Sequence, residues 1–206
     1  MKRLAVFVSG RGSNFRAVHA AIQQEALPAE VLLVVTDKPD CPAADYAREH
    51  GIEVVAYPSG GLTAAGLAEL LQDRAVGFLV LAGYMKLVPS EVVQAYPRGI
   101  LNIHPALLPA FGGKGFYGRR VHEAVIASGA KVSGVTVHFV DEEYDRGPIL
   151  AQLVVPVRTD DTPDSLAERV LAQEHRLYPK VIAALCRGEI HWREDGVPFI
   201  DPPLLS

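Results

Sequence analysis

Cysteine, methionine and tryptophan are scarce in this chain, and long apolar runs are absent. Its two cysteines, Cys41 and Cys186, stand far apart in neither a metal-binding nor a redox spacing, which argues against a disulfide framework and favours a reducing cytoplasm. No apolar run approaches the roughly 20 residues that span a bilayer. The first run, Leu4–Val8, is too short for the core of a signal peptide and predicts a strand instead. We therefore expect a soluble cytoplasmic protein.

A strong excess of charge is lacking as well. Twenty basic and 24 acidic side chains give a formal net charge of -4, which implies no general attraction to nucleic acid or to an anionic membrane. His104, His122, His138 and His175 follow no metal-ligand pattern such as His-Glu-x-x-His, so we expect no metal site.

The chain does have enough apolar side chains for one large core. Its 206 residues are 49% hydrophobic, which predicts a single domain over residues 1–206.

Strand-like apolar runs alternate with helical patterns through the first hundred residues. This order favours an α/β fold with a mostly parallel, Rossmann-like central sheet and helices on both faces. The predicted strands are Leu4–Val8, Val31–Val35, Ile52–Val55, Phe78–Leu81 and Ile100–Ile103, and the predicted helices are about Asn14–Glu25, Ala43–His50 and Leu62–Arg74.

The second half predicts an antiparallel strand or two. A long helix begins at Thr162-Pro163, with apolar residues at helical spacing, and Pro179 is expected to kink it. The other predicted elements are a loop at Pro109–Tyr117, a helix at about Arg120–Ser128, strands at Val132–Val140 and Ile149–Val155, and a hairpin of Ile190–Arg193 and Val197–Ile200.

The segment Asn102-Ile103-His104-Pro105 places an amide and an imidazole at the carboxyl end of a predicted strand, where open α/β sheets bind their ligands. Residues two apart in an extended segment point to the same face, so Asn102 and His104 can address one atom together. The ordinary pKa of histidine lies near neutrality, which suits a general acid, a general base or an electrophile. We infer that the chain is an enzyme.

An acidic loop over residues 140–148 can supply a carboxylate that orients His104 or holds it protonated. Asp145, just before a glycine-containing turn, is the residue we choose for this role. Glu142 and Glu143 are expected to be solvated. His138 lies on the less apolar face of the preceding strand, where a structural role and a place near the site both remain open.

The loop Ser9-Gly10-Arg11-Gly12-Ser13-Asn14 follows the first strand and opens a helix, so its amides can cradle a phosphate. It matches neither the dinucleotide fingerprint nor the Walker loop. Asp37, after the second strand, keeps an NAD-binding alternative open. The other alternative is a tight turn in which Asn14 merely caps the helix.

Glu174, inside the long helix and followed by His175, has two interpretations. It receives a cationic or amine group, or it lies on the helix surface.

Taken in order, these motifs resemble the phosphoribosylglycinamide formyltransferase family of folate-dependent enzymes. The resemblance spans nearly the whole chain. It rests on Ser9 to Asn14, Leu81-Ala82-Gly83-Tyr84-Met85-Lys86, Asn102-Ile103-His104-Pro105, Leu107-Leu108-Pro109, Val137-His138-Phe139-Val140-Asp141, Asp145-Arg146-Gly147-Pro148-Ile149 and Gln173-Glu174-His175.

The resemblance implies formyl transfer from 10-formyltetrahydrofolate to the amine of glycinamide ribonucleotide in purine (IMP) biosynthesis, without a metal. Residues 1–100 would form the phosphate-binding half and residues 101–206 the catalytic and folate-binding half of a monomer or homodimer. It implies catalysis by Asn102, His104 and Asp145, ribonucleotide binding by Gly12, Ser13, Asn14 and Glu174, folate binding by Met85, Lys86, Leu87, Val88, Asn102 and Asp141, and a place near the site for His138.

The chain departs from the family pattern at three places. Phe111-Gly112-Gly113 stands where Phe-Pro-Gly is usual, Lys86 replaces a common arginine, and residues 60–66 lack a basic residue that relatives often direct toward the folate tail.

Three alternatives remain. A formyltetrahydrofolate deformylase would use the same three catalytic residues on water but usually carries an extra amino-terminal domain. A methionyl-tRNA formyltransferase would need a further carboxyl-terminal domain for tRNA. A noncatalytic NAD-type module would leave Asn102, His104 and Asp145 without a purpose.

Overall fold

The chain divides into two compact units in the computed structural model, which describes residues 1–204. Unit 1 runs from Met1 to Asn102, and unit 2 begins at Ile103. The single domain predicted over residues 1–206 remains a prediction, and its last two residues, Leu205 and Ser206, lie outside the described part.

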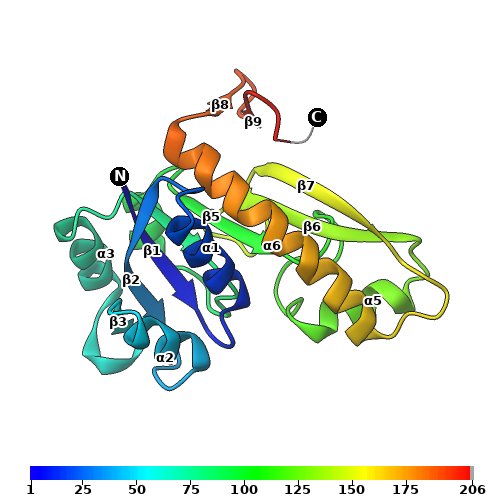
Figure 1. The fold of residues 1–206 in the computed structure, drawn as a ribbon, viewed down its shortest axis with the longest axis horizontal. Coiled ribbons are helices and arrows are strands. Elements are labelled where there is room, and N and C mark those ends of the chain that lie inside the picture. The colour runs from blue at the N-terminus through cyan, green and yellow to red at the C-terminus, as the bar shows by residue number, and fades with distance from the viewer. Residues whose placement is uncertain (205–206) are drawn as a thin grey trace. The chain divides into compact units, whose positions relative to one another are not determined.

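Unit 1 alternates strands and helices along the chain (Figure 1). Its elements are β1 (Lys2–Val8), α1 (Ser13–Gln23), β2 (Ala29–Thr36), α2 (Pro42–Glu49), β3 (Glu53–Ala56), the 3-10 turn η1 (Ser59–Gly61), α3 (Ala64–Asp73), β4 (Phe78–Leu81), α4 (Ser90–Ala95) and β5 (Ile100–His104), whose last two residues belong to unit 2.

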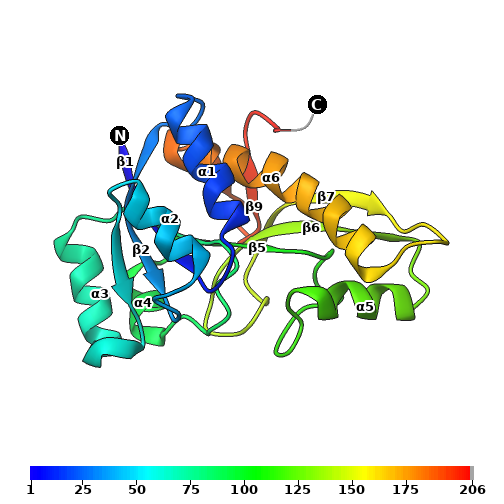
Figure 2. The same ribbon diagram turned by 60° about the horizontal axis from the view of Figure 1, so that its bottom comes forward.

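Parallel pairing joins these strands in the order β3-β2-β1-β4-β5. Residues Leu4–Val8 of the central strand β1 are fully buried because both faces of the sheet are covered. Helices α1 and α2 lie on one face and α3 and α4 on the other (Figure 1, Figure 2). Right-handed crossovers require this arrangement, since the chain first moves from β1 out to β3 and then returns to β4 and β5.

Unit 2 is built on a long helix and an antiparallel strand pair. Its elements after β5 are α5 (Arg119–Ala127), β6 (Val132–Phe139), β7 (Ile149–Pro156), α6 (Pro163–Arg187), β8 (Ile190–Trp192) and β9 (Pro198–Ile200). Helix α6 packs against α5, β6 and β7. Thr162 and Ser165 form a capping box at the start of α6, and Gly188 ends it in the left-handed conformation.

The strand order confirms the predicted fold class. Seven strands follow the order β3-β2-β1-β4-β5-β6-β7, with β6 and β7 antiparallel to each other, and β8 and β9 form a separate antiparallel pair. No helix in the described part of the chain is both long enough and apolar enough for a membrane span.

Several local predictions need correction. Helix α1 begins at Ser13 with Gly12 as its N-cap, so the alternative in which Asn14 caps this helix is wrong. The sequence did not predict η1 and α4, because elements of three and six residues are too short to show a helical period. Pro179 lies inside α6, which continues to Arg187, and proline removes one helical hydrogen bond there without ending the helix. The kink expected at Pro179 stays a prediction.

Candidate active site

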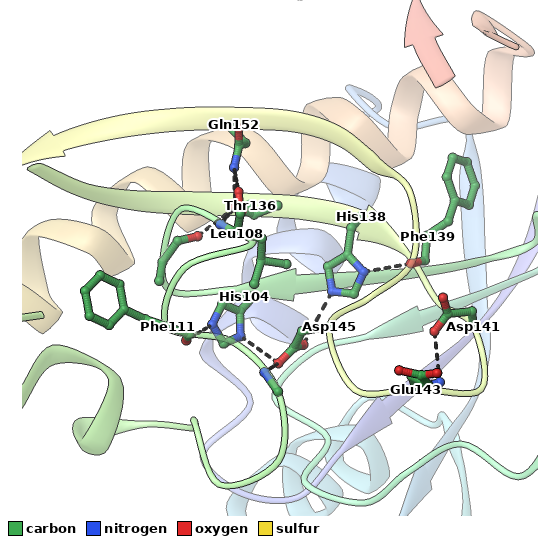
Figure 3. A network of polar contacts seen from close by, with 12 residues as sticks. His104, Leu108, Phe111, Thr136, His138, Phe139, Asp141, Glu143, Asp145 and Gln152 are labelled. Atoms are coloured by element: carbon green, nitrogen blue, oxygen red, sulfur yellow. Dashed lines mark hydrogen bonds and ion pairs between the residues drawn. The ribbon is translucent and has the colours of Figure 1, made fainter. Parts of the chain in front are cut away.

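His104, the last residue of β5, lies between the carbonyl oxygen of Phe111 and the carboxylate of Asp145 (Figure 3). Its Nε2 lies 2.8 Å from the carbonyl oxygen of Phe111, and its Nδ1 lies 3.6 Å from Oδ2 of Asp145. The side chain is 5% exposed. A carbonyl oxygen can only accept, so Nε2 carries a proton and donates it to Phe111.

Asp145 connects this histidine to two further groups of unit 2. Its Oδ2 accepts a hydrogen bond from the amide of Gly113 at 2.8 Å. Its Oδ1 lies 3.6 Å from Nε2 of His138, whose Nδ1 in turn donates to the carbonyl of Phe139 at 2.7 Å. One carboxylate is therefore shared by two buried imidazoles and one backbone amide, as Figure 3 shows.

Burial and charge shift the pKa values of His104 and Asp145 in opposite directions. Burial lowers the pKa of His104 below its ordinary value, although the charge of Asp145 and the hydrogen bond to Phe111 act to raise it. Burial raises the pKa of Asp145, but the contacts from His138, His104 and Gly113 together bring it below its ordinary value. From the sequence, Asp145 was expected to orient His104 or to hold it protonated; its charge acts toward protonation, but burial outweighs that charge in the free protein.

The two residues that contact the ring of His104 have an uncommon backbone conformation. Phe111, whose carbonyl accepts from the ring, and Asp145, whose carboxylate faces it, have φ values of 55° and 57°. Positive φ is uncommon for residues other than glycine, and such strain gathers at functional sites.

Asn102 precedes His104 by two residues in β5 and is the last residue of unit 1. Successive side chains of a strand alternate between its faces, so Asn102 and His104 share one face of β5.

The loop after β1 forms a second candidate site, within unit 1. Gly12 has a φ of 70°, and a Cβ atom there would lie 2.5 Å from Cβ of Ala43, so the position requires glycine. The first turn of α1 contains no acidic residue, and its amides are those of Ser13, Asn14 and Phe15. A helix amino terminus of this kind attracts anions.

The segment predicted to bind folate lies beside this loop. The amide of Met85 donates to Oγ of Ser9 at 2.9 Å, which joins two motifs that are far apart in the sequence. Met85 and Leu87 are 38% and 43% exposed, Lys86 is exposed, and Val88 is buried. Exposed apolar side chains next to a buried one can pack against a flat, partly apolar ligand.

Other predicted residues are placed as follows. Oδ1 of Asp141 accepts the amide of Glu143, and Glu142 and Glu143 are exposed, as expected for solvated side chains. Glu174 is only 6% exposed, so the alternative in which it lies on the helix surface is wrong. Its neighbour His175 is half-buried, and burial lowers its pKa.

Sequence reasoning missed the backbone groups that hold His104, the carbonyl of Phe111 and the amide of Gly113. It also missed His122, a buried residue of α5 whose pKa is lowered by burial and by the charge of His104. The Gly112-Gly113 pair was the signal available for the loop, since adjacent glycines often mark a backbone that approaches another group closely.

Among residues 1–204, no group of three or more His, Cys, Asp or Glu side chains is arranged to hold a metal ion.

Comparisons with known proteins all identify formyltransferases as similar to this chain. Residues 2–182 match the family model described as formyl transferase. The chain is 56% identical to a chloroplastic phosphoribosylglycinamide formyltransferase of Arabidopsis thaliana, over 97% of this chain and 70% of that protein. It is 38% identical to the phosphoribosylglycinamide formyltransferase of Bacillus subtilis, over 92% of this chain and 99% of that protein. Among solved structures, glycinamide ribonucleotide transformylase 1 from Symbiobacterium toebii superposes with a TM-score of 0.87 at 38% identity, over 98% of this chain and 95% of that one.

Proposed function

Because the chain belongs to the phosphoribosylglycinamide formyltransferase family, we propose that it transfers the formyl group of 10-formyltetrahydrofolate to the amine of glycinamide ribonucleotide in purine biosynthesis. The observation that carries the proposal is the buried His104, held between Asp145 and the carbonyl of Phe111 and two residues after Asn102 in the same strand. This combination of amide, imidazole and carboxylate suits a reaction in which negative charge develops on one oxygen atom.

The reaction forms a bond between the amine nitrogen and the formyl carbon and breaks the bond from that carbon to N10 of the folate. 10-Formyltetrahydrofolate supplies the formyl group, and its N10 takes up the proton that the amine loses. Asn102 donates a hydrogen bond to the formyl oxygen as it gains negative charge, and His104, whose ring nitrogens face Phe111 and Asp145, stabilises that oxygen by the positive charge of its protonated ring. A hydrogen-bond donor of this kind typically stabilises a transition state by about 2.7 to 4 kcal/mol.

Asp145 supports His104 in this step through its charge. In the free protein burial favours the neutral imidazole, and Asp145 opposes that preference. Negative charge on the formyl oxygen adds to the field of Asp145, so the ring takes up a proton from solvent as the charge develops and returns it when the charge is lost. His104 thus stabilises the transition state more than the ground state, which is what acceleration requires.

The ribonucleotide phosphate binds to Gly12, Ser13 and Asn14 in this proposal. The left-handed Gly12 and the amides that begin α1 support it, because they form a positive site without an acidic residue. Glu174 binds the glycinamide amine. Its carboxylate is buried, and the N–H groups of the amine would donate the hydrogen bonds that a buried carboxylate needs.

The folate binds to Met85, Lys86, Leu87, Val88, Asn102 and Asp141. The exposed apolar side chains of Met85 and Leu87 support this proposal. Lys86 makes a point-charge contact where a common arginine would make a forked one, which is expected to weaken folate binding rather than formyl transfer.

The surroundings and assembly of the protein are part of the same proposal. Cys41 and Cys186 are both buried, and neither forms a disulfide bond within the described residues, which supports a reducing compartment, and we propose the cytoplasm. The relative from Arabidopsis thaliana is named chloroplastic. The small-molecule substrates require neither nucleic acid nor a membrane, and the protein acts as a monomer or homodimer.

The test follows tetrahydrofolate, formate and formylated ribonucleotide together, with and without glycinamide ribonucleotide. Tetrahydrofolate that appears only with the ribonucleotide, in amounts equal to the formylated product, supports the proposal. Formate released at a comparable rate without the ribonucleotide would identify a deformylase instead. Saturable binding of NAD in a parallel titration would favour the nicotinamide alternative.

A further inference from the structure

A second polar network lies beside His104 and is centred on Thr136 (Figure 3). Thr136 is fully buried in β6. Its hydroxyl donates to the carbonyl of Ala106 at 2.6 Å and accepts from the amide of Leu108 at 3.0 Å and from Nε2 of Gln152 at 2.9 Å. A hydroxyl has one donor and two acceptor positions, so all three are used.

Gln152 completes the network from the neighbouring strand. It stands directly opposite Thr136 in the β6–β7 ladder, and its Nε2 also donates to the carbonyl of Leu108 at 3.0 Å. Both backbone groups of Leu108 are therefore held, its amide by Thr136 and its carbonyl by Gln152. The turn that follows His104 is thus fixed to β6 and β7 at Ala106 and at Leu108.

This turn connects His104 to the residue that accepts its hydrogen bond, Phe111. It approaches β6 closely, because a Cβ atom at Gly134 would lie only 2.5 Å from Cδ2 of Leu107. Gly134, Thr136 and His138 alternate along β6 and share one of its faces. Along that face, Gly134 leaves room for Leu107 of the turn, the hydroxyl of Thr136 bonds the backbone of the turn, and His138 contacts Asp145.

We propose that Thr136 and Gln152 are positioning residues, which fix the turn over residues 105–109 so that the ring of His104 stays between Phe111 and Asp145. The inference rests on the proposed function and adds two residues to its site. A misplacement of about 1 Å can reduce a rate about 10²-fold, so a turn held at two points matters for catalysis. Loss of the hydroxyl would leave the carbonyl of Ala106 and the amide of Leu108 buried without partners.

The experiment compares Thr136→Val, Thr136→Ser and Gln152→Leu with two controls. Ser133→Ala removes another buried hydroxyl of β6, one whose oxygen has no hydrogen-bond partner among the described residues. Leu71→Ala opens the core of unit 1 and supplies a loss of stability unrelated to the turn. For each variant, kcat, KM, the thermal unfolding midpoint and the pKa of His104, from an NMR titration of its ring, are measured.

Thr136→Val is expected to lower kcat about 10- to 100-fold while both KM values change less than about threefold, because ring placement and not substrate binding is lost. The pKa of His104 should rise toward its ordinary value, since burial is the main cause of its lowering. Thr136→Ser should keep kcat within about threefold of the native value, because its hydroxyl makes the same bonds. The kcat of Gln152→Leu should lie between those of Thr136→Val and Thr136→Ser. Both controls should keep the native kcat and the native titration of His104.

The proposal is wrong if Thr136→Val and Gln152→Leu lower the unfolding midpoint as Leu71→Ala does but keep the native kcat and His104 titration. Should Thr136→Val fail to fold, Gln152→Leu decides, because Gln152 is exposed and its replacement is tolerated more easily. If the native protein transfers no formyl group, the proposed function fails, whereas the His104 titration still tests the positioning role.

Discussion

Nδ1 of His104 lies 3.6 Å from Oδ2 of Asp145, and the opposite ring nitrogen donates to the carbonyl of Phe111. Both neighbours of the ring can only accept when Asp145 is ionised. A neutral imidazole donates to the carbonyl of Phe111, whereas the protonated ring also presents an N–H group toward the carboxylate of Asp145. Burial acts against the protonated form. Burial therefore favours the neutral ring in the free protein, and a further negative charge nearby shifts the equilibrium toward the protonated ring.

Asp145→Asn is expected to lower the pKa of His104 further, because the charge that raises it is removed while burial remains. If the protonated ring is the active form, the native kcat declines as pH rises through this pKa, and in the variant the decline moves to lower pH. NMR titration of the His104 ring and a kcat–pH profile measure both effects. Glu143→Gln removes an exposed charge from the same loop and should leave both unchanged. An unchanged or raised pKa in Asp145→Asn would contradict the assignment.

Asn102→Ala is expected to reduce kcat about 10²- to 10³-fold, the cost of removing one donor to a developing oxyanion. The KM values should change little, because the donor acts on the transition state. The fold should be kept, as judged by the thermal unfolding midpoint. Gln72→Ala, which removes an exposed amide from α3, serves as the control. A KM that rises with an unchanged kcat would assign Asn102 to substrate binding instead.

Much of the fold was predictable from the sequence because apolar runs and helical periods alternate clearly. The parallel strands of unit 1 and the antiparallel pair β6 and β7 were predicted, with ends displaced by a few residues. Short elements such as α4 were not, because six residues span less than two helical turns.

The candidate site was less predictable than the fold. Asn102, His104 and Asp145 stood out because of their residue types and their positions at strand ends. The partners that hold them did not, since the carbonyl of Phe111 and the amide of Gly113 are backbone groups that every residue carries. The network of Thr136 and Gln152 depends on strand register, which determines that these two residues face each other.

Gly12→Ala is expected to raise the KM for glycinamide ribonucleotide by an order of magnitude or more. An alanine there would adopt a left-handed conformation, which costs about 1–2 kcal/mol, and its Cβ would collide with Ala43. The loop would have to move, and the amides that begin α1 would move with it. Gly10→Ala is the matched control, because a Cβ atom at Gly10 meets nothing within 4 Å. Equal KM values for the two variants would argue against a phosphate site at Gly12.

A final prediction concerns acid stability and rests on Asp161, which lies between β7 and α6. Its carboxylate forms a two-pronged ion pair with Arg169 and accepts from the amide of Arg158 and the hydroxyl of Ser165. The side chain is 2% exposed. The hydrogen bonds from Arg169 are the main cause that holds the pKa of Asp161 far below its ordinary value, and burial opposes them.

A carboxylate whose pKa is lower in the folded than in the unfolded state stabilises the fold at pH values above the unfolded pKa, about 3.9. That contribution is lost as the pH falls through the folded pKa. Asp161→Asn should therefore lower the free energy of unfolding at pH 7 by about 1.5 to 3 kcal/mol, the usual worth of hydrogen bonds to a charged group. The difference between native protein and variant should shrink steadily below pH 4. Denaturant unfolding of both proteins at pH 7, 5, 4 and 3 measures it, with Asp160→Asn as the exposed neighbouring control. A difference that stays constant down to pH 3 would mean that the ion pair with Arg169 contributes no pH-dependent stability, because only a difference in proton binding between the folded and unfolded states can make the two curves converge.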